Sequence, residues 1–472
     1  MYVQNQIEEP IMIRIFKHIT IMMVVLLPIA CVELEQNISA EQEVINILNQ
    51  ELPFHSVSPA LFERLGWDLP DGGSAVKTLA EAATGSAFDP RDLENISANE
   101  LGYTANWHVL RYQVYGLDWD ITGLYLKPQN PLPHMPTMVF VHGGSSNWYE
   151  FFIDPLNNPG LGQYLAQKVP VLLVTIPGNF RYGGWTESSL DQRIPPYVLD
   201  QQIGPSELRI RNAAYTFRLV ADGVKLLVEE ITTGPVVIPG HSTGGEITYM
   251  VETSDYLRNR TGGRILLWEG GSHAGTQAMQ ATRGTPNRGN WPAVTELKAR
   301  LPEVDYTGSY LGPLNPVWDE SKTRLEMAQR WMGELEFQRR ANFKQPLQDL
   351  ERRGTLRESV TDEVRQALQD NEFGIDPEEV VADLYAPIRA PLTGYRAIIR
   401  TAAGDELAGN LSEASLNGTR TMETIKELRE LNMDAEVRFL IFDVPMTHYG
   451  HIERPKQLAG GLVAVLKWLI QQ

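Results

Sequence analysis

The sequence predicts a protein of the α/β class, with a mostly parallel sheet covered by helices. The first observation is a series of short, continuous apolar runs, each followed by a turn and then by a helical pattern. Strands that are buried on both faces of a parallel sheet have this uninterrupted apolar character. The second observation is that the alternation stops after residue 268 and resumes at residue 395. One sheet interrupted by a helical insertion explains both observations.

The expected elements follow in chain order. Strand signals at 107–115 and 119–127 flank a turn at 116–118, which is typical of an antiparallel hairpin. The later apolar runs predict strands at 137–141, 169–176, 235–238, 264–268, 395–401 and 436–442. Helices are expected at 205–230, from residue 243, at 411–431 and at 455–469. In the first of these helices apolar residues recur every three to five positions, as on the buried face of an amphipathic helix.

Shifts in composition divide the chain into five segments. Residues 1–30 have the pattern of a signal peptide, and residues 31–104 form a polar, turn-rich N-terminal extension. The α/β core is expected in two parts, 105–275 and 386–472. Residues 276–385 between these parts are mostly helical in pattern and strongly charged, so we interpret them as a helical insertion into the sheet.

The N-terminus predicts an exported protein. Basic residues precede the uncharged run 19–30, which is too short to span a bilayer and ends at the single cysteine, Cys31. The residues before Cys31 resemble a bacterial lipobox, in which the cysteine is lipidated, although Pro28 stands where an aliphatic residue is usual. We expect a lipoprotein of the bacterial periplasm or cell envelope if Cys31 carries lipid, and a secreted protein otherwise. Met1 and Met12 are alternative starts.

The composition excludes several classes of partner and cofactor. A chain of 472 residues with 43% hydrophobic and 21% charged residues is long enough to bury a large core. Its net charge of −18 repels phosphate backbones, so we expect no nucleic acid partner. A single cysteine excludes an intrachain disulfide and a zinc site built mainly on thiolates. Because the common metal and nucleotide motifs are also missing from the sequence, we expect no cofactor and no metal.

The chemistry concentrates in the sequence G-H-S-T-G at residues 240–244. The pattern G-x-S-x-G places its serine, here Ser242, on a sharp turn from strand to helix. Glycine stands two residues before and two residues after the serine, because the crowded backbone of this turn leaves no room for larger side chains. The apolar run before the motif and the helical pattern after it supply the required context. We therefore predict that Ser242 is a nucleophile.

On these residues the chain resembles the α/β-hydrolase superfamily, from about residue 105 to 472. The resemblance implies that the insertion 276–385 is a helical cap, since it stands where that fold often carries one. The resemblance implies that a turn after an early strand supplies part of the oxyanion hole. The sequence H-G-G at residues 142–144 stands at that place. The implied oxyanion donors are the backbone N–H groups of Thr243 and of Gly144 or its neighbour Gly143.

The resemblance also implies a base and an acid. The family keeps its base after the last strand, where His448 lies seven residues before Pro455, as in the family pattern, and His451 matches a secondary histidine. We favour His448 and keep His451 as the alternative base. Asp405 follows the strand where the acid usually stands, and Glu269 follows an earlier strand that carries the acid in some relatives. We favour Asp405 and keep Glu269 as the alternative.

The implied function is hydrolysis of a small-molecule carboxylic ester through a Ser-His-Asp triad and an acyl-enzyme. A serine nucleophile argues against a dehalogenase or an epoxide hydrolase, whose relatives use a carboxylate. A peptidase or amidase and an inactive binding protein of the same fold are the alternatives. Membrane contact is expected only through the lipid anchor. We expect aromatic residues of 178–185, with Trp148 and Tyr149, to line an acyl or aromatic pocket.

Overall fold

The computed structural model describes the parts of the chain that form the sheet and most of the helices packed on it. The described residues are 39–50, 55–57, 61, 64, 69–82, 89–143, 148–153, 158–177, 205–241, 244–245, 247–248, 251, 260–262, 264–268, 357–384, 397–403, 436–442, 451 and 455–472. Within these ranges, no helix is both long enough and apolar enough to cross a bilayer.

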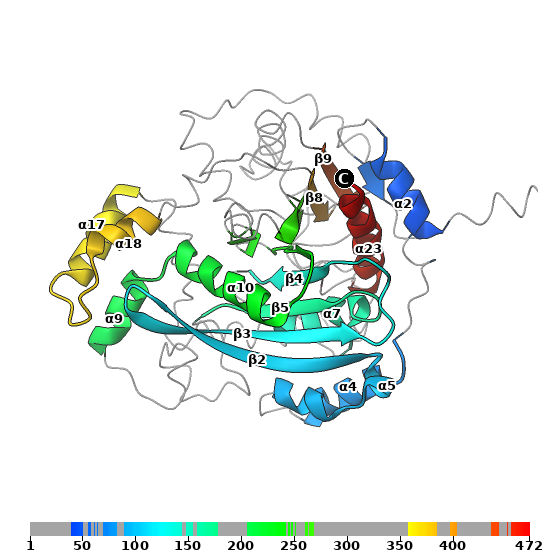
Figure 1. Ribbon diagram of the computed structural model, residues 1–472, viewed down its shortest axis with the longest axis horizontal. Helices are drawn as coiled ribbons and strands as arrows, with labels where there is room; N and C mark the ends of the chain where they lie inside the picture. The colour runs from blue at the N-terminus through cyan, green and yellow to red at the C-terminus, as the bar shows by residue number, and fades with distance from the viewer. Residues whose placement is uncertain are drawn as a thin grey trace, which may run out of the picture.

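The described strands form a mixed sheet, in which antiparallel pairing is confined to one side. They are β1 (His55–Val57), β2 (Tyr103–Val114), β3 (Leu117–Pro128), β4 (Thr137–Val141), β5 (Val171–Thr175), β6 (Val236–Val237), β7 (Arg264–Trp268), β8 (Ala397–Ala403) and β9 (Glu436–Phe442). Hydrogen bonds order them as β2-β3-β5-β4-β6 and β7-β8-β9-β1, and β6 lies beside β7. The pairs β2–β3 and β3–β5 are antiparallel, and the other pairs are parallel. Figure 1 shows the hairpin at one side and β8 and β9 at the other.

Helices cover both faces of the sheet. They are α2 (Ala40–Leu48), α4 (Gly72–Ala82), the 3-10 helix η1 (Pro90–Asn95), α5 (Ala98–Leu101), α6 (Tyr149–Phe152), α7 (Leu161–Leu165), α9 (Pro205–Ala213), α10 (Phe217–Ile231), α17 (Arg357–Leu368), α18 (Pro377–Leu384) and α23 (Pro455–Gln471). Alternate residues of β4 enter two different cores: Met138 and Phe140 pack with α7 and α23, whereas Val139 and Val141 pack with α10. The apolar run is continuous because both faces of the strand are buried.

The hairpin is confirmed, but its turn is not where the sequence pattern placed it. Val114 pairs with Leu117, so the turn consists of Tyr115 and Gly116 and not of residues 116–118. Both turn residues have positive φ, 55° and 72°, as a two-residue type I′ turn requires. The hydroxyl of Tyr115 donates to Asp383 Oδ2 at 2.6 Å, which anchors a non-glycine residue in this conformation.

The single helix expected at 205–230 is wrong, because the structure contains two helices, α9 and α10. Thr216 is extended between them, with φ −126° and ψ 162°, and its Oγ1 accepts a hydrogen bond from Leu219 N at 3.2 Å. Threonine in this position is a common helix N-cap, and it starts a new helix. Apolar periodicity continues across the break because both helices pack against the same core.

The N-terminal extension contributes a strand to the sheet, which the sequence pattern did not reveal. β1 pairs in parallel with β9, with His55 opposite Leu440. α2 packs against α23, where Trp468 Nε1 donates to Asn49 Oδ1 at 2.9 Å. A three-residue strand leaves too short a signal to be recognised from periodicity.

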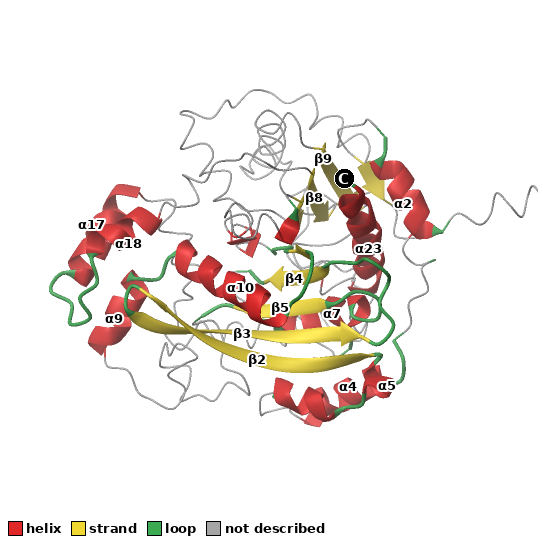
Figure 2. Ribbon diagram, in the orientation of Figure 1, coloured by secondary structure: helices red, strands yellow, loops and turns green. Residues whose placement is uncertain are grey.

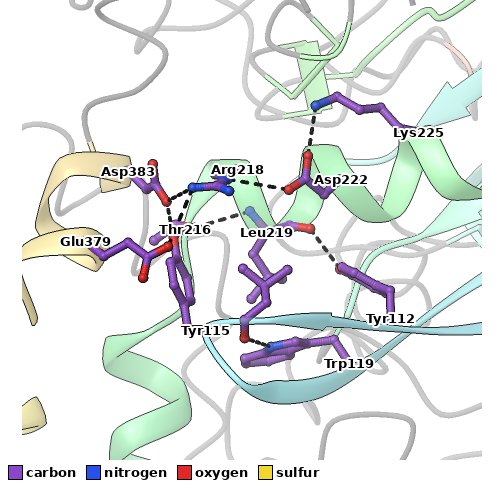
Figure 3. A network of polar contacts seen from close by, with 11 residues as sticks. Tyr112, Tyr115, Trp119, Thr216, Arg218, Leu219, Asp222, Lys225, Glu379 and Asp383 are labelled. Carbon is purple, nitrogen blue, oxygen red and sulfur yellow. Dashed lines mark hydrogen bonds and ion pairs between the residues drawn. The ribbon is translucent and has the colours of Figure 1, made fainter. Parts of the chain in front are cut away.

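The described end of the expected cap, residues 357–384, packs against the core. α17 lies against α9, and α18 lies against α10 (Figure 2). Asp383 of α18 accepts a hydrogen bond from Arg218 Nη1 at 2.7 Å, in addition to the bond from Tyr115 (Figure 3). This network joins α18, the start of α10 and the hairpin turn.

Candidate active site

The structure brings the two glycine-containing motifs together at the ends of β4 and β6. Val141 and Gly240 form a parallel bridge, and His241 N donates to Val141 O at 2.9 Å. The turn His142-Gly143 begins directly after Val141. The residue before Ser242 and the predicted oxyanion turn are therefore neighbours in space.

The two glycines that flank Ser242 are required by close backbone contacts. A Cβ added to Gly240 meets Gly244 O at 2.2 Å, and a Cβ added to Gly244 meets Val141 O at 2.2 Å. Both distances are far below a normal contact, and backbone atoms have little freedom to move away. Gly244 N also donates to His241 O at 2.8 Å. Helical residues follow from Gly244, so the described residues around Ser242 have the strand-turn-helix arrangement that the motif requires.

A buried carboxylate lies between two imidazoles beside this turn. Glu150 of α6 is 4% exposed, His241 is 2% exposed and His451 is fully buried. Glu150 Oε1 lies 3.2 Å from His241 Nδ1, and Glu150 Oε2 lies 3.8 Å from His451 Nε2. The two imidazole rings are 4.3 Å apart, centre to centre. The first distance is that of a hydrogen bond, and the second is an electrostatic contact.

The neighbours of Glu150 keep it ionised. Burial alone raises its pKa, but the contacts with the two imidazoles, His241 first and then His451, outweigh burial and hold the pKa of Glu150 well below its ordinary value. A buried carboxylate is tolerated only with such compensation. The Gly143 amide also donates to Glu150 Oε1, at 3.4 Å.

His142 is a second buried imidazole at the same edge, and it is neutral. Burial lowers the pKa of His142 to about 4. Its Nδ1 lies 2.7 Å from Gly143 O, and its Nε2 accepts a hydrogen bond from Ile176 N at 3.2 Å. These two bonds place the ring proton on Nδ1 and link the turn after β4 to the end of β5.

The cluster of Glu150, His241 and His451 also offers the type of donor atoms that bind metals. Among the described residues these three bring one ligand atom each within 4.8 Å of one another. The ligands of a tetrahedral zinc ion lie about 3.3 Å apart, given zinc–ligand bonds of about 2.0 to 2.1 Å. The cluster is wider than that, and one of its pairs is already hydrogen-bonded. A hydrogen-bonded cluster therefore fits these distances better than a zinc site.

The structure describes two of the predicted site residues. Gly143 is one, and its amide is directed at Glu150, which leaves Gly144 and Thr243 as the predicted oxyanion donors. His451 is the other, and its ring is buried against Glu150. The predicted residues outside the described ranges are Ser242, Thr243, Gly144, His448, Asp405, Glu269 and Cys31.

The expectation that Trp148 lines a pocket is wrong. Its side chain is fully buried, with ring centres 5.6 Å from Trp107 and 5.3 Å from Phe152. Residues 178–185 lie outside the described residues. Glu150 itself was missed, although a carboxylate among the aromatic residues that follow the H-G-G turn is an unusual pattern. Its partners are 91 and about 300 residues away, so that only the fold brings them together.

The match to a protein family agrees with this architecture. Residues 138–460 match the model of the alpha/beta hydrolase family, and no match is found among curated proteins. A bacterial membrane phospholipase A of known structure is 14% identical, with a TM-score of 0.37 over 84% of this chain and 92% of its own. A Vigna radiata epoxide hydrolase mutant is 12% identical, with a TM-score of 0.39 over 76% and 98% of the two chains. A haloalkane dehalogenase variant from Bradyrhizobium elkanii is 13% identical, with a TM-score of 0.37 over 78% and 97%. The family model covers more than half of the sequence, and the protein belongs to the alpha/beta hydrolase family, as its sequence predicts.

Proposed function

We propose that the protein hydrolyses carboxylic esters, with Ser242 as nucleophile, His448 as base and Asp405 as acid. The observation that carries this proposal is the turn around residues 240–244. Backbone contacts require glycine at both flanking positions, and the described residues enter the turn from a strand and leave it in a helix. A serine at such a turn is presented for nucleophilic attack.

The proposed reaction has two halves. His448 removes the proton from Ser242 Oγ, which attacks the ester carbonyl carbon and forms a tetrahedral intermediate. Backbone N–H groups of Thr243 and Gly144 stabilise its oxyanion. When the intermediate collapses, the ester C–O bond breaks and the alcohol leaves with the proton from His448. Water then attacks the acyl-enzyme, gives its proton to His448 and releases the carboxylic acid, after which Ser242 regains its proton.

The surroundings of His451 support His448 as the base. Nε2 of His451 faces Glu150, and its ring packs 5.0 Å from the ring of Phe151. A base must reach both the serine and the leaving group, and a fully enclosed ring is poorly placed for this. For the acid, the chain order Ser242, Asp405, His448 agrees with the order usual in this family. Glu269 is the alternative acid.

The experiment that tests the proposed function combines covalent labelling with turnover. A fluorophosphonate probe should label Ser242 of the purified protein, and p-nitrophenyl esters should be hydrolysed faster than aminoacyl amides. The variant Ser242→Ala should lose labelling and about 10⁶-fold in kcat, as expected for the loss of a triad nucleophile. Ser97→Ala is the matched control, because Ser97 caps α5 in the N-terminal extension.

The control should keep both labelling and turnover. Labelling at another residue, or more than a few per cent of turnover in Ser242→Ala, contradicts the nucleophile assignment. Preferential cleavage of the amides moves the protein to the peptidase or amidase alternative. Wild-type protein that neither reacts with the probe nor turns over any substrate indicates an inactive binding protein.

A further inference from the structure

We propose that Glu150 is a positioning residue that fixes the nucleophile turn and the base loop relative to each other. This inference rests on the proposed function, because it assigns Glu150 a role through Ser242 and His448. The carboxylate contacts His241, which directly precedes Ser242, and His451, which lies three residues after His448. It also accepts a bond from the amide of Gly143, in the predicted oxyanion turn.

A single carboxylate therefore meets the three segments that carry the proposed catalytic groups. These segments come from distant parts of the sequence and follow different strands: residue 143 follows β4, residue 241 follows β6, and residue 451 lies between β9 and α23. The ring of His451 packs against that of His241, with 4.3 Å between the ring centres. Glu150 adds a polar link between these segments through its two oxygens, one for each imidazole.

Glu150 is itself held in place by the packing of α6. Trp148 N donates to Thr175 Oγ1 of β5 at 3.0 Å, which fixes the start of this short helix. Phe151 and Phe152 are fully buried, and Gly160 N donates to Phe152 O at 2.8 Å at its other end. A side chain carried by a fixed element has few alternative positions, which is a requirement for precise placement of neighbouring groups.

The charge of the carboxylate is part of the role. Oε1 of Glu150 faces His241 Nδ1, and Oε2 faces His451 Nε2. Electrostatic interactions between such groups are strong where water is excluded. Glutamine has the same shape, but it offers only one acceptor oxygen, and its amide nitrogen turns a donor toward one of the imidazoles. The glutamine variant therefore removes one link while it keeps the volume.

The variant Glu150→Gln tests the role. We expect kcat to fall about 100-fold while KM stays within about twofold, since misplacement of reacting groups by about 1 Å has an effect of this size. The rate at which the fluorophosphonate labels Ser242 should fall by the same factor. A loss of folded protein alone lowers the amplitude of labelling and leaves its rate unchanged, so that the rate separates positioning from stability.

Asp120→Asn is the matched control. Asp120 is also a buried carboxylate, 4% exposed, and it is hydrogen-bonded to Arg111 Nε at 3.0 Å within the hairpin. Its substitution makes the same change from carboxylate to amide away from the proposed site, and should leave kcat and the labelling rate unchanged. If Glu150→Gln does not fold, His451→Gln replaces it, with the same expected division between kcat and KM.

A double variant completes the test. If Glu150 and His451 act together, Glu150→Gln with His451→Gln should lose little more than the worse single variant, because members of one network are not additive. Additive losses, or a folded Glu150→Gln with the kcat and labelling rate of wild type, overturn the proposal. One equivalent of zinc in the purified wild type, absent from Glu150→Gln, overturns it in favour of a metal site. Wild-type protein that is not labelled at Ser242 overturns the proposed function as well, so the two failures are distinguishable.

Discussion

Two histidines three positions apart are expected to differ by orders of magnitude in their effect on turnover. His448→Ala should lose nearly as much kcat as Ser242→Ala, because a triad acts as a unit and its losses do not add. His451→Ala should lose about 10- to 100-fold, since it acts only through Glu150. It should also lower the free energy of unfolding by about 2 to 4 kcal/mol, because it opens a buried space and leaves the Glu150 carboxylate with one imidazole fewer.

Steady-state kinetics and urea unfolding of both variants check this prediction. His448→Ala should keep the stability of wild type to within about 1 kcal/mol. The reverse result, with His451→Ala the less active but stable variant, moves the base to His451.

At the residue scale, the sequence predicts positions whose reason is local. The glycines at 240 and 244 are an example, because the crowding that requires them arises from backbone within the motif and the adjacent strand. Glu150 is the opposite case. Its role depends on His241 and His451, and no local pattern encodes contacts between residues so far apart in the chain.

At the scale of elements, the turn between β6 and the following helix should tolerate no side chain at Gly244. A Cβ there meets backbone atoms of both Val141 and His142 within 2.5 Å. Gly244→Ala should therefore shift the strand or the helix and reduce activity together with stability, by more than 3 kcal/mol, as expected for severe overpacking. Gly234→Ala is the control, because Gly234 has φ +78° and no atom within 4 Å of the added Cβ. It should lose only about 1 kcal/mol, from backbone strain.

Urea unfolding and ester turnover of the two variants decide this prediction. A Gly244→Ala protein with the stability of the Gly234→Ala control shows that the turn adjusts freely, and then the tight turn is no longer evidence for a presented nucleophile.

The elements also show where periodicity succeeds and where it fails. The strands Thr137–Val141, Arg264–Trp268 and Glu436–Phe442 have the predicted bounds, because burial on both faces leaves apolar runs with clear ends. The helix expected at 205–230 fails, because one helix ends at Ala213 and Thr216 starts another while the apolar pattern continues. β1 is missed because three residues are too few to show a strand pattern, and only the pairing with β9 identifies them as a strand.

At the scale of the whole molecule, the stability of the fold should decrease on acidification through a buried carboxylate, Glu150, and a buried imidazole, His142, which act in different pH windows. The lowered pKa of Glu150 makes its contribution complete above the unfolded value of about 4.5, and the contribution is lost as the pH falls further. Between pH 7 and 5 its contribution is therefore nearly constant. This window separates the effect of His142 from that of Glu150.

His142 should destabilise the fold progressively as the pH falls from 7 to 5. Burial lowers its folded-state pKa to about 4, whereas the unfolded chain takes up the proton near the ordinary value of 6.5. The unfolded state thus binds more protons in this window, and the free energy of unfolding must decrease as the pH decreases. The full shift corresponds to about 3 kcal/mol, of which about 2 kcal/mol is lost by pH 5. In His142→Asn, the difference in unfolding free energy between pH 7 and pH 5, measured with urea, should be smaller than in wild type by about this amount. An equal pH dependence in the two proteins means that His142 takes up its proton as readily in the fold as in the unfolded chain, which contradicts the bond that its Nε2 accepts from Ile176 N.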